Sequence, residues 1–324
     1  MAIVGQVVLL AAGLAVLGVG GELLVRGAAN LARSLGVSAL LVGLTIVAYG
    51  TSAPEAAVSV QATLKGEVDI AVGNIVGSNI ANILLILGLG AAVRTFSVAL
   101  NVLKTDGPIM VLVTGVFMLL GLRQHGAGTI GRWEGAALLA GLVAYGWLTY
   151  YMARREPVAV VNEYTAALKK HGSRAFNVLL ILIGIVALVV GGRMIVHGAV
   201  GVAAHLGIGQ AFIGLTIVAV GTSLPELAAS IAAVRQNQPD IAIGNIVGSN
   251  ICNILFVLGL SAVAEPVVVS RETMLQDGPA MLAASVLFLL IVRSGQRVTR
   301  GEGVLLLVLY AVYLAWTVGR AFAH

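Results

Sequence analysis

Long apolar stretches alternate with short polar interruptions along the whole chain. Ten of these stretches are at least 18 residues long, and a helix that crosses a bilayer needs about 20 apolar residues. The pattern therefore predicts ten membrane-spanning helices. Their expected ranges are residues 3–28, 36–64, 69–92, 105–122, 133–153, 176–199, 207–234, 240–263, 275–292 and 303–322.

The chain repeats itself at an offset of 171 residues. Residues 43–55 (GLTIVAYGTSAPE) recur as residues 214–226 (GLTIVAVGTSLPE), and residues 73–83 (GNIVGSNIANI) recur as residues 244–254 (GNIVGSNICNI). Asp-Gly-Pro sequences at 106–108 and 277–279 keep the same offset. The constant offset of these motifs indicates that the chain contains a duplicated unit.

The most polar interruption, residues 154–174, separates the two copies. We expect a first five-helix repeat at 1–153, a short linker at 154–174 and a second five-helix repeat at 175–324. Because each repeat has an odd number of helices, the second must enter the membrane from the opposite side. The predicted fold class is an all-α integral membrane protein with ten transmembrane helices in two inverted repeats. Inverted repeats are typical of secondary transporters, with the substrate site at the midplane between them.

Composition supports a membrane protein and narrows its chemistry. Of the 324 residues, 59% are hydrophobic and 10% charged, whereas soluble domains carry about 25% charged residues. This balance excludes a water-soluble globule, a disordered protein and a coiled coil. The single cysteine, Cys252, excludes a disulfide framework or a thiolate metal cluster within one chain. The five histidines are scattered, so we expect no cofactor.

The basic residues predict the orientation in the membrane. Thirteen of the 19 Lys and Arg residues lie in the loops that follow helices 1, 3, 5, 7 and 9. Cytoplasmic loops carry the excess of such residues. We therefore expect a multi-pass protein of the cell (inner or plasma) membrane, with both termini outside and the 154–174 loop in the cytoplasm. The cations are dispersed rather than gathered in one patch, so nucleic-acid binding is not expected. The first cation is Arg26, so the first helix should be retained rather than cleaved as a signal peptide.

Glu55 and Glu226 lie deep in apolar segments, at equivalent positions of the two repeats. A carboxylate there costs several kcal/mol (~3 or more) unless it is paired or lines a cavity. Each glutamate directly follows a proline, which cannot donate a backbone hydrogen bond and disrupts the helix. We expect the prolines to free the carbonyls of Gly50 and Gly221 and to loosen neighbouring ones, such as that of Ala48. Freed carbonyls at this depth suit a cation.

Neutral oxygens surround the glutamates in the sequence. Ser78 and Asn82 share a helix face at i,i+4 spacing, and the second repeat carries the same pair. Hydroxyl, amide and carboxylate oxygens suit hard cations such as Ca²⁺, Na⁺ or Mg²⁺ rather than zinc or copper. The neutral ligand candidates are Thr51, Ser52, Ser78, Asn82, Thr222, Ser223, Ser249 and Asn253.

Other repeated residues have a structural interpretation. The small-xxx-small patterns Gly73/Gly77 and Gly244/Gly248 predict close helix packing. Asp106 and Asp277 precede Gly-Pro and are expected to cap helices. Four further asparagines are expected to cap or bridge helices: Asn74, Asn79, Asn245 and Asn250.

At these motifs the chain resembles the sodium/calcium exchanger family of the cation/calcium antiporter superfamily, in its prokaryotic type. GTSAPE, ending at Glu55, with GSNIAN, ending at Asn82, is similar to the first alpha-repeat of that family. GTSLPE, ending at Glu226, with GSNICN, ending at Asn253, is similar to the second. The likeness covers the whole ten-helix plan.

The resemblance implies roles for these residues. Glu55 and Glu226 would be the central calcium ligands, shared with sodium, and Asn82 and Asn253 would face them at the midplane. The first and sixth helices would slide against the rest. Flanking oxygens would come from Thr51, Thr222, Ser52, Ser78, Ser223 and Ser249 and from the carbonyls of Ala48 and Ala219.

Two features differ from some relatives. Certain prokaryotic members carry Asp in place of one midplane asparagine, whereas both are Asn here, so the site has at most two carboxylates. The 154–174 linker is far too short for the calcium-sensing domain of eukaryotic members.

The leading hypothesis is an electrogenic antiporter, not an enzyme, that exchanges Na⁺ for Ca²⁺ by alternating access, with these ions and the lipid bilayer as its partners. No protein partner can be inferred. A Ca²⁺/H⁺ antiporter is the near alternative, because two close carboxylates can also take protons. A passive cation channel and an intramembrane hydrolase using Ser52 or Ser223 are distant alternatives. The hydrolase lacks a histidine base in the motif segments.

Overall fold

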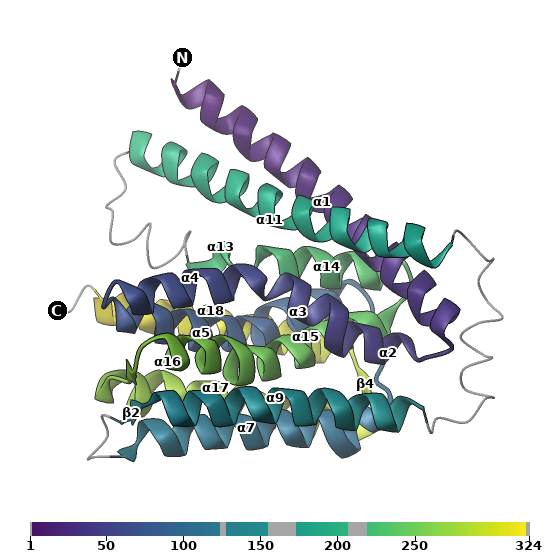
Figure 1. The fold of residues 1–324 in the computed structure, drawn as a ribbon. Helices are drawn as coiled ribbons and strands as arrows, with labels where there is room; N and C mark the ends of the chain where they lie inside the picture. The colour runs from purple at the N-terminus through teal and green to yellow at the C-terminus, as the bar shows by residue number, and fades with distance from the viewer. Residues whose placement is uncertain (1, 124–127, 155–172, 207–218, 322–324) are drawn as a thin grey trace.

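The computed structural model describes residues 2–123, 128–154, 173–206 and 219–321. Within these ranges, eight helices are long and apolar enough to cross a membrane, or nine if a bent helix pair counts as one span. The remaining predicted span, residues 207–234, is described only from Ala219 onward. Figure 1 shows α1 and α11 crossing along one side of the bundle and α7 and α9 on the opposite side.

Helices of the first repeat follow the predicted spans, with local breaks. The helical elements are α1 (Ala2–Leu35), α2 (Ala39–Val42), the π-helical turn η1 (Gly43–Val47), α3 (Ala48–Thr51), α4 (Ala53–Leu64), α5 (Val68–Ala81), the π-helical turn η2 (Asn82–Leu87), α6 (Gly88–Val93), the π-helical turn η3 (Val102–Asp106), α7 (Gly107–Gly121) and α9 (Arg132–Ala153).

The second repeat is built in the same way. Its described helical elements are α11 (Arg174–His205), α13 (Ala219–Gly221), α14 (Leu224–Arg235), α15 (Pro239–Cys252), the π-helical turn η5 (Asn253–Leu258), α16 (Gly259–Ala264), α17 (Arg271–Gly295) and α18 (Arg300–Ala321).

The first helix is longer than its apolar pattern predicted. α1 continues to Leu35 instead of ending at residue 28, and within this polar extension Arg33 Nη2 donates to Asn30 Oδ1 at 2.6 Å. The helix ends where Gly36 takes a φ of +67° and Val37 N–H donates to the Ala32 carbonyl at 3.0 Å. This left-handed glycine cap is a common helix terminator.

Two small sheets join the repeats and were not predicted. β1 (Phe96–Ser97) pairs antiparallel with β4 (Arg297–Val298), and β2 (Thr129–Ile130) pairs antiparallel with β3 (Val267–Val268). The loops after helices 3 and 9 therefore lie on one face, and those after helices 4 and 8 lie together. β2 and β4 are found at opposite ends of the bundle in Figure 1. This is the loop arrangement that two inverted repeats require.

The helices α1 and α11 open the two repeats and pack antiparallel. A Cβ atom built on Gly13 would lie 2.9 Å from the backbone nitrogen of Ile195, whereas one on Gly27 would lie 2.9 Å from the side chain of Ile181. The contact glycines recur every seven residues, about two helical turns, and so share a face. They are Gly13, Gly20 and Gly27 on α1 and Gly184, Gly191 and Gly198 on α11.

The most buried of the long helices that the structure describes is α15, in which every residue from Asp240 to Cys252 is buried. Gly244 and Gly248 let it approach η1 and α2, since Cβ atoms there would lie 2.8 Å from the Leu40 carbonyl oxygen and 2.7 Å from that of Leu44. Close packing is thus confirmed for this pair. No heavy atom of the described residues lies within 4 Å of a Cβ built on Gly73 or Gly77, so the packing expected there is not seen.

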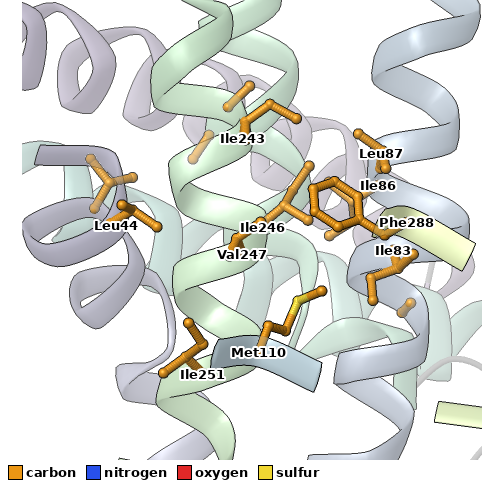
Figure 2. Packing of buried hydrophobic residues seen from close by; sticks show 14 of the residues in the cluster. Leu44, Ile83, Ile86, Leu87, Met110, Ile243, Ile246, Val247, Ile251 and Phe288 are labelled. Carbon is orange, nitrogen blue, oxygen red and sulfur yellow. The ribbon is translucent and has the colours of Figure 1, made fainter. Parts of the chain in front are cut away.

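The apolar core surrounds α15. Figure 2 shows buried side chains of α15 between Leu44 of η1 on one side and residues of η2 and α17 on the other. The labelled members of this cluster are Leu44, Ile83, Ile86, Leu87, Met110, Ile243, Ile246, Val247, Ile251 and Phe288.

The expectation that Asp106 and Asp277 cap helices is wrong. Asp106 ends η3, with helical backbone and no side-chain cap bond, and Asp277 lies inside α17. Both helices begin earlier than the Gly-Pro sequences suggest. The carboxylates instead bond to the last helix of each repeat: Tyr145 OH donates to Asp106 at 3.0 Å and Tyr313 OH to Asp277 at 3.1 Å.

We predict that Gly20→Val destabilises the protein by about 1–3 kcal/mol, because overpacking a close contact forces the backbones apart. A Cβ on Gly20 would lie 2.8 Å from the backbone nitrogen of Leu188. Thermal unfolding in detergent measures the effect. Gly18→Val is the matched control, since Gly18 is exposed on the same helix with no atom within 4 Å. Equal melting temperatures for the two variants would contradict this role of Gly20.

Candidate ion-binding site

Two breaks in the helices place the predicted glutamates at helix N-termini. The first span bends by 43° between Thr51 and Ala53, and α4 then begins with Pro54 and Glu55 in its first turn. In the second repeat α14 begins with Pro225 and Glu226 in the same positions. The positive end of the helix dipole stabilises a carboxylate at this place.

Both glutamates are buried without a basic partner. Glu55 is 0% exposed and Glu226 is 1% exposed. The ion pairs found among the described residues join arginines at 123, 132 and 320 to other acids. A structural ion pair therefore does not account for Glu55 or Glu226 within the described chain.

Each carboxylate is bonded to the other repeat. Ser52 Oγ donates to Glu226 Oε1 at 3.2 Å, and Ser223 Oγ donates to Glu55 Oε1 at 3.5 Å. The two Oε2 atoms are buried and have no hydrogen-bond partner among the residues that the structure describes. A buried anionic oxygen without a partner is unfavourable, so these two atoms fit a bound cation.

Further unpartnered oxygens lie on α15 and on the π-helical turns. Asn82 begins η2 and Asn253 begins η5, at equivalent positions. Asn82 Oδ1, Asn253 Oδ1 and Ser249 Oγ are buried without hydrogen-bond partners. π-Helical turns within α-helices are frequent at functional sites.

The two repeats are not identical here. The Ser223 hydroxyl, which has one proton, lies 3.0 Å from Ser78 Oγ and 3.5 Å from Glu55 Oε1. Ser249, the counterpart of Ser78, has no hydrogen-bond partner among the described residues. Asn253 Nδ2 donates to Asn79 Oδ1 at 3.0 Å, whereas Asn82 Nδ2 is unpartnered.

The threonine side chains also form hydrogen bonds between the two repeats. Thr51 Oγ1 donates to Asn245 Oδ1 and Thr222 Oγ1 donates to Asn74 Oδ1, both at 3.0 Å. The prediction that Asn74 and Asn245 bridge helices is confirmed. Asn79 is a bridge as well, because Nδ2 donates to the Asn250 carbonyl at 3.4 Å.

Asn250 is different, since its Nδ2 bonds back to the Ile246 carbonyl of its own helix at 2.8 Å. Sequence reasoning missed Ser59 and Ser230, which accept from Asn74 and Asn245 at 2.9 Å. Each serine lies four residues after a glutamate, and the two serines are separated by the same 171-residue offset as the motifs. This repetition could have identified them from the sequence.

The loosening expected at Ala48 is not seen. Its carbonyl accepts the Ser52 N–H at 3.0 Å, as in a regular helix, and also Thr51 Oγ1 at 3.3 Å. A carbonyl oxygen has two lone pairs. The Ser52 N–H takes one of them, and Thr51 has a single hydroxyl proton, for which Asn245 Oδ1 at 3.0 Å is the nearer acceptor. In the second repeat Ala219 begins α13, and Ser223 N–H donates to the Val220 carbonyl, three residues back, at 3.1 Å.

The grouped atoms suit hard cations. They are carboxylate, hydroxyl, amide and carbonyl oxygens, the ligand set of calcium and similar ions. The described residues contain no group of three or more His, Cys, Asp and Glu side chains able to hold a metal ion. A zinc or copper centre is thus not formed by this part of the chain.

Comparison with known proteins gives full-length similarities. CaxA of Alkalimonas amylolytica is 40% identical over 294 residues, covering 89% of this chain and 91% of that protein. The inner membrane protein YrbG of Escherichia coli is 39% identical over 314 residues, with 95% of each covered. The sodium/calcium exchanger MaX1 of Methanosarcina acetivorans is 32% identical over 333 residues, covering 93% of this chain and 95% of that protein.

The fold is also that of a solved exchanger. The structure of the sodium-calcium exchanger NCX_Mj soaked with zero Na⁺ and Ca²⁺ has a TM-score of 0.83 and 30% identity, covering 97% of this chain and 99% of that chain. The family described as sodium/calcium exchanger protein matches residues 5–151 and 176–319, one stretch in each repeat. The protein is a multi-pass membrane transporter of cations and not an enzyme, and it belongs to the sodium/calcium exchanger protein family.

Proposed function

We propose that the protein exchanges Na⁺ for Ca²⁺ across the membrane. The observation that carries this proposal is the pair of buried glutamates, one from each repeat, whose Oε2 atoms have no hydrogen-bond partner in the described part of the chain. Two carboxylates balance one Ca²⁺. Sodium ions compete for the same oxygens, so both species cannot fill the site together, and this exclusion couples their transport.

The proposed ligands come from the helices that carry the motifs. Glu55 and Glu226 are the central calcium ligands, and Asn82 and Asn253 face them. The flanking sodium sites use hydroxyl and carbonyl oxygens. This set consists of Ser52, Ser223, Ser78, Ser249, Ala48 and Ala219, while Thr51 and Thr222 contribute oxygens beside the two glutamates.

We infer that exchange proceeds by alternating access around a midplane site between the repeats, with one repeat at 1–153 and the other at 175–324. The packing of α1 and α11 supports this. Their mutual contact is lined by glycines over a long distance, so they can move together as one unit. More than two Na⁺ per Ca²⁺ would move net charge, each charge contributing about 2.3 kcal/mol per 100 mV.

A Ca²⁺/H⁺ antiporter is the second candidate. Two buried carboxylates without a basic partner among the described residues can be neutralised by protons as well as by sodium. The hydroxyl oxygens repeated around them favour sodium, because protonation of a carboxylate needs no such shell.

The orientation is part of the proposal. We infer that the termini face outside and that the 154–174 linker is cytoplasmic, because thirteen of the 19 Lys and Arg residues lie on the linker's side. YrbG, an inner membrane protein, supports an inner or plasma membrane location.

We predict that proteoliposomes loaded with Na⁺ take up Ca²⁺ when diluted into Na⁺-free medium, with pH clamped by a protonophore and buffer. Uptake should stop when Na⁺ is equal on both sides, because the sodium gradient drives the exchange. Isotopic calcium measures the flux. Uptake driven by an imposed proton gradient but not by sodium would favour the Ca²⁺/H⁺ antiporter instead.

Glu226→Gln should abolish calcium transport while the protein still folds. Removing one partner of a buried charge pair costs about 3–5 kcal/mol, which lowers affinity by more than about 100-fold. Glu67→Gln is the matched control, since Glu67 is exposed and makes no capping bond. Transport at the wild-type rate by Glu226→Gln would refute the assignment of the site.

Orientation is testable with single cysteines in a Cys252→Ala background, in which position 252 matches its counterpart Ala81. In intact cells a membrane-impermeant maleimide should label a cysteine at residue 324 but not one at residue 162. Labelling of residue 162 alone would reverse the proposed orientation.

A further inference from the structure

Two asparagines make the same three hydrogen bonds beneath the proposed site. Asn245 Nδ2 donates to the Glu226 carbonyl at 3.2 Å and to Ser230 Oγ at 2.9 Å, and its Oδ1 accepts from Thr51 at 3.0 Å. Asn74 repeats the pattern in the other half. It donates to the Glu55 carbonyl at 3.3 Å and to Ser59 at 2.9 Å and accepts from Thr222 at 3.0 Å.

The backbone of the glutamate fixes the direction of each amide. The Glu226 carbonyl can only accept a hydrogen bond, so it must face Asn245 Nδ2. Asn245 Oδ1 then faces Thr51, and this oxygen can also only accept. Thr51 must therefore donate its single hydroxyl proton to Asn245 Oδ1, on the side that faces away from the ion site.

This direction decides whether Thr51 can bind a cation. A hydroxyl has one proton and two lone pairs, and the lone pairs face a cation only when the proton has another acceptor. Another acceptor within reach of the Thr51 hydroxyl is the Ala48 carbonyl at 3.3 Å, which is itself a proposed ligand. Asn245 thus keeps the Thr51 and Ala48 oxygens available together.

We propose that Asn74 and Asn245 are positioning residues of the cation site. Each holds the glutamate backbone of its own repeat and orients the threonine hydroxyl of the other repeat toward a hard cation, without touching the ion. The inference rests on the proposed location of the site. Outer hydrogen bonds of this kind act on metal affinity through the ligand that they orient.

The test is Ca²⁺ binding to purified full-length protein by calorimetry, without any gradient. We expect Asn245→Leu to weaken Ca²⁺ binding by about 10–100-fold. Ser230→Ala is the matched control: it removes another bond of Asn245 Nδ2 but keeps the Thr51 bond, so it should bind Ca²⁺ as the wild type does. Equal affinities for Asn245→Leu and wild type would overturn the proposal.

A double-variant comparison separates positioning from support of the fold. In a Thr51→Val background, Asn245→Leu should weaken binding by a smaller factor than it does in the wild type, because no hydroxyl remains to be oriented and only the bond to the Glu226 carbonyl is lost. Independent, multiplicative losses would overturn the proposal. A purely structural asparagine would lower the ion-free melting temperature and leave affinity unchanged.

Should Asn245→Leu fail to fold, the half-buried Asn74 gives the same test with Asn74→Leu and Thr222→Val. Failure of the exchange proposal remains distinguishable. A wild type that binds Ca²⁺ without sodium-driven exchange refutes the exchange and leaves the asparagine test valid, whereas no Ca²⁺ binding by the wild type overturns both.

Discussion

A carboxylate cannot be buried in a bilayer without compensation, and this protein buries Glu55 and Glu226 completely or almost so. Glu55 and Glu226 have no arginine or lysine partner in the described chain, so their environment has to supply compensation in other ways. Helix breaks place both at positive helix ends, and hydroxyls reach them from the opposite repeat. Broken helices are tolerated at this depth only where protein or a polar cavity satisfies the freed backbone groups.

Neither repeat completes this environment alone. The amide of Asn74 supports the Glu55 backbone from the same repeat, while Ser223, from the other repeat, bonds to the Glu55 side chain. In the second repeat, Asn245 supports the Glu226 backbone, and Ser52 from the first repeat bonds to the Glu226 side chain. Any movement of one repeat relative to the other therefore changes hydroxyl contacts at both glutamates together, which links the state of the site to the arrangement of the helices.

Sequence alone predicted the features that duplication and hydrophobicity encode. The 171-residue offset and the apolar stretches were enough to predict the helices, the inverted repeats and the buried glutamates. It did not predict features that depend on which segments meet. Asp106 bonds to Tyr145 because α9 packs near η3, and nothing in the Asp-Gly-Pro sequence specifies that neighbour. Likewise, the Ala48 carbonyl stays in the helical ladder although Pro54 follows closely, because the proline begins a new helix beyond the break.

The small sheets have a consequence for biosynthesis. β1 is made early, yet its partner β4 lies almost at the end of the chain. Contacts between residues so distant in sequence carry a large loop-closure cost and form late. The first repeat, although inserted first, must wait in the membrane without its hydrogen bonds to Thr222, Ser223 and Asn245 until these residues arrive, and without the β1–β4 pairing until α17 is complete. Assembly therefore depends on complete translation, and a truncated chain would leave polar groups that quality-control proteases can recognise.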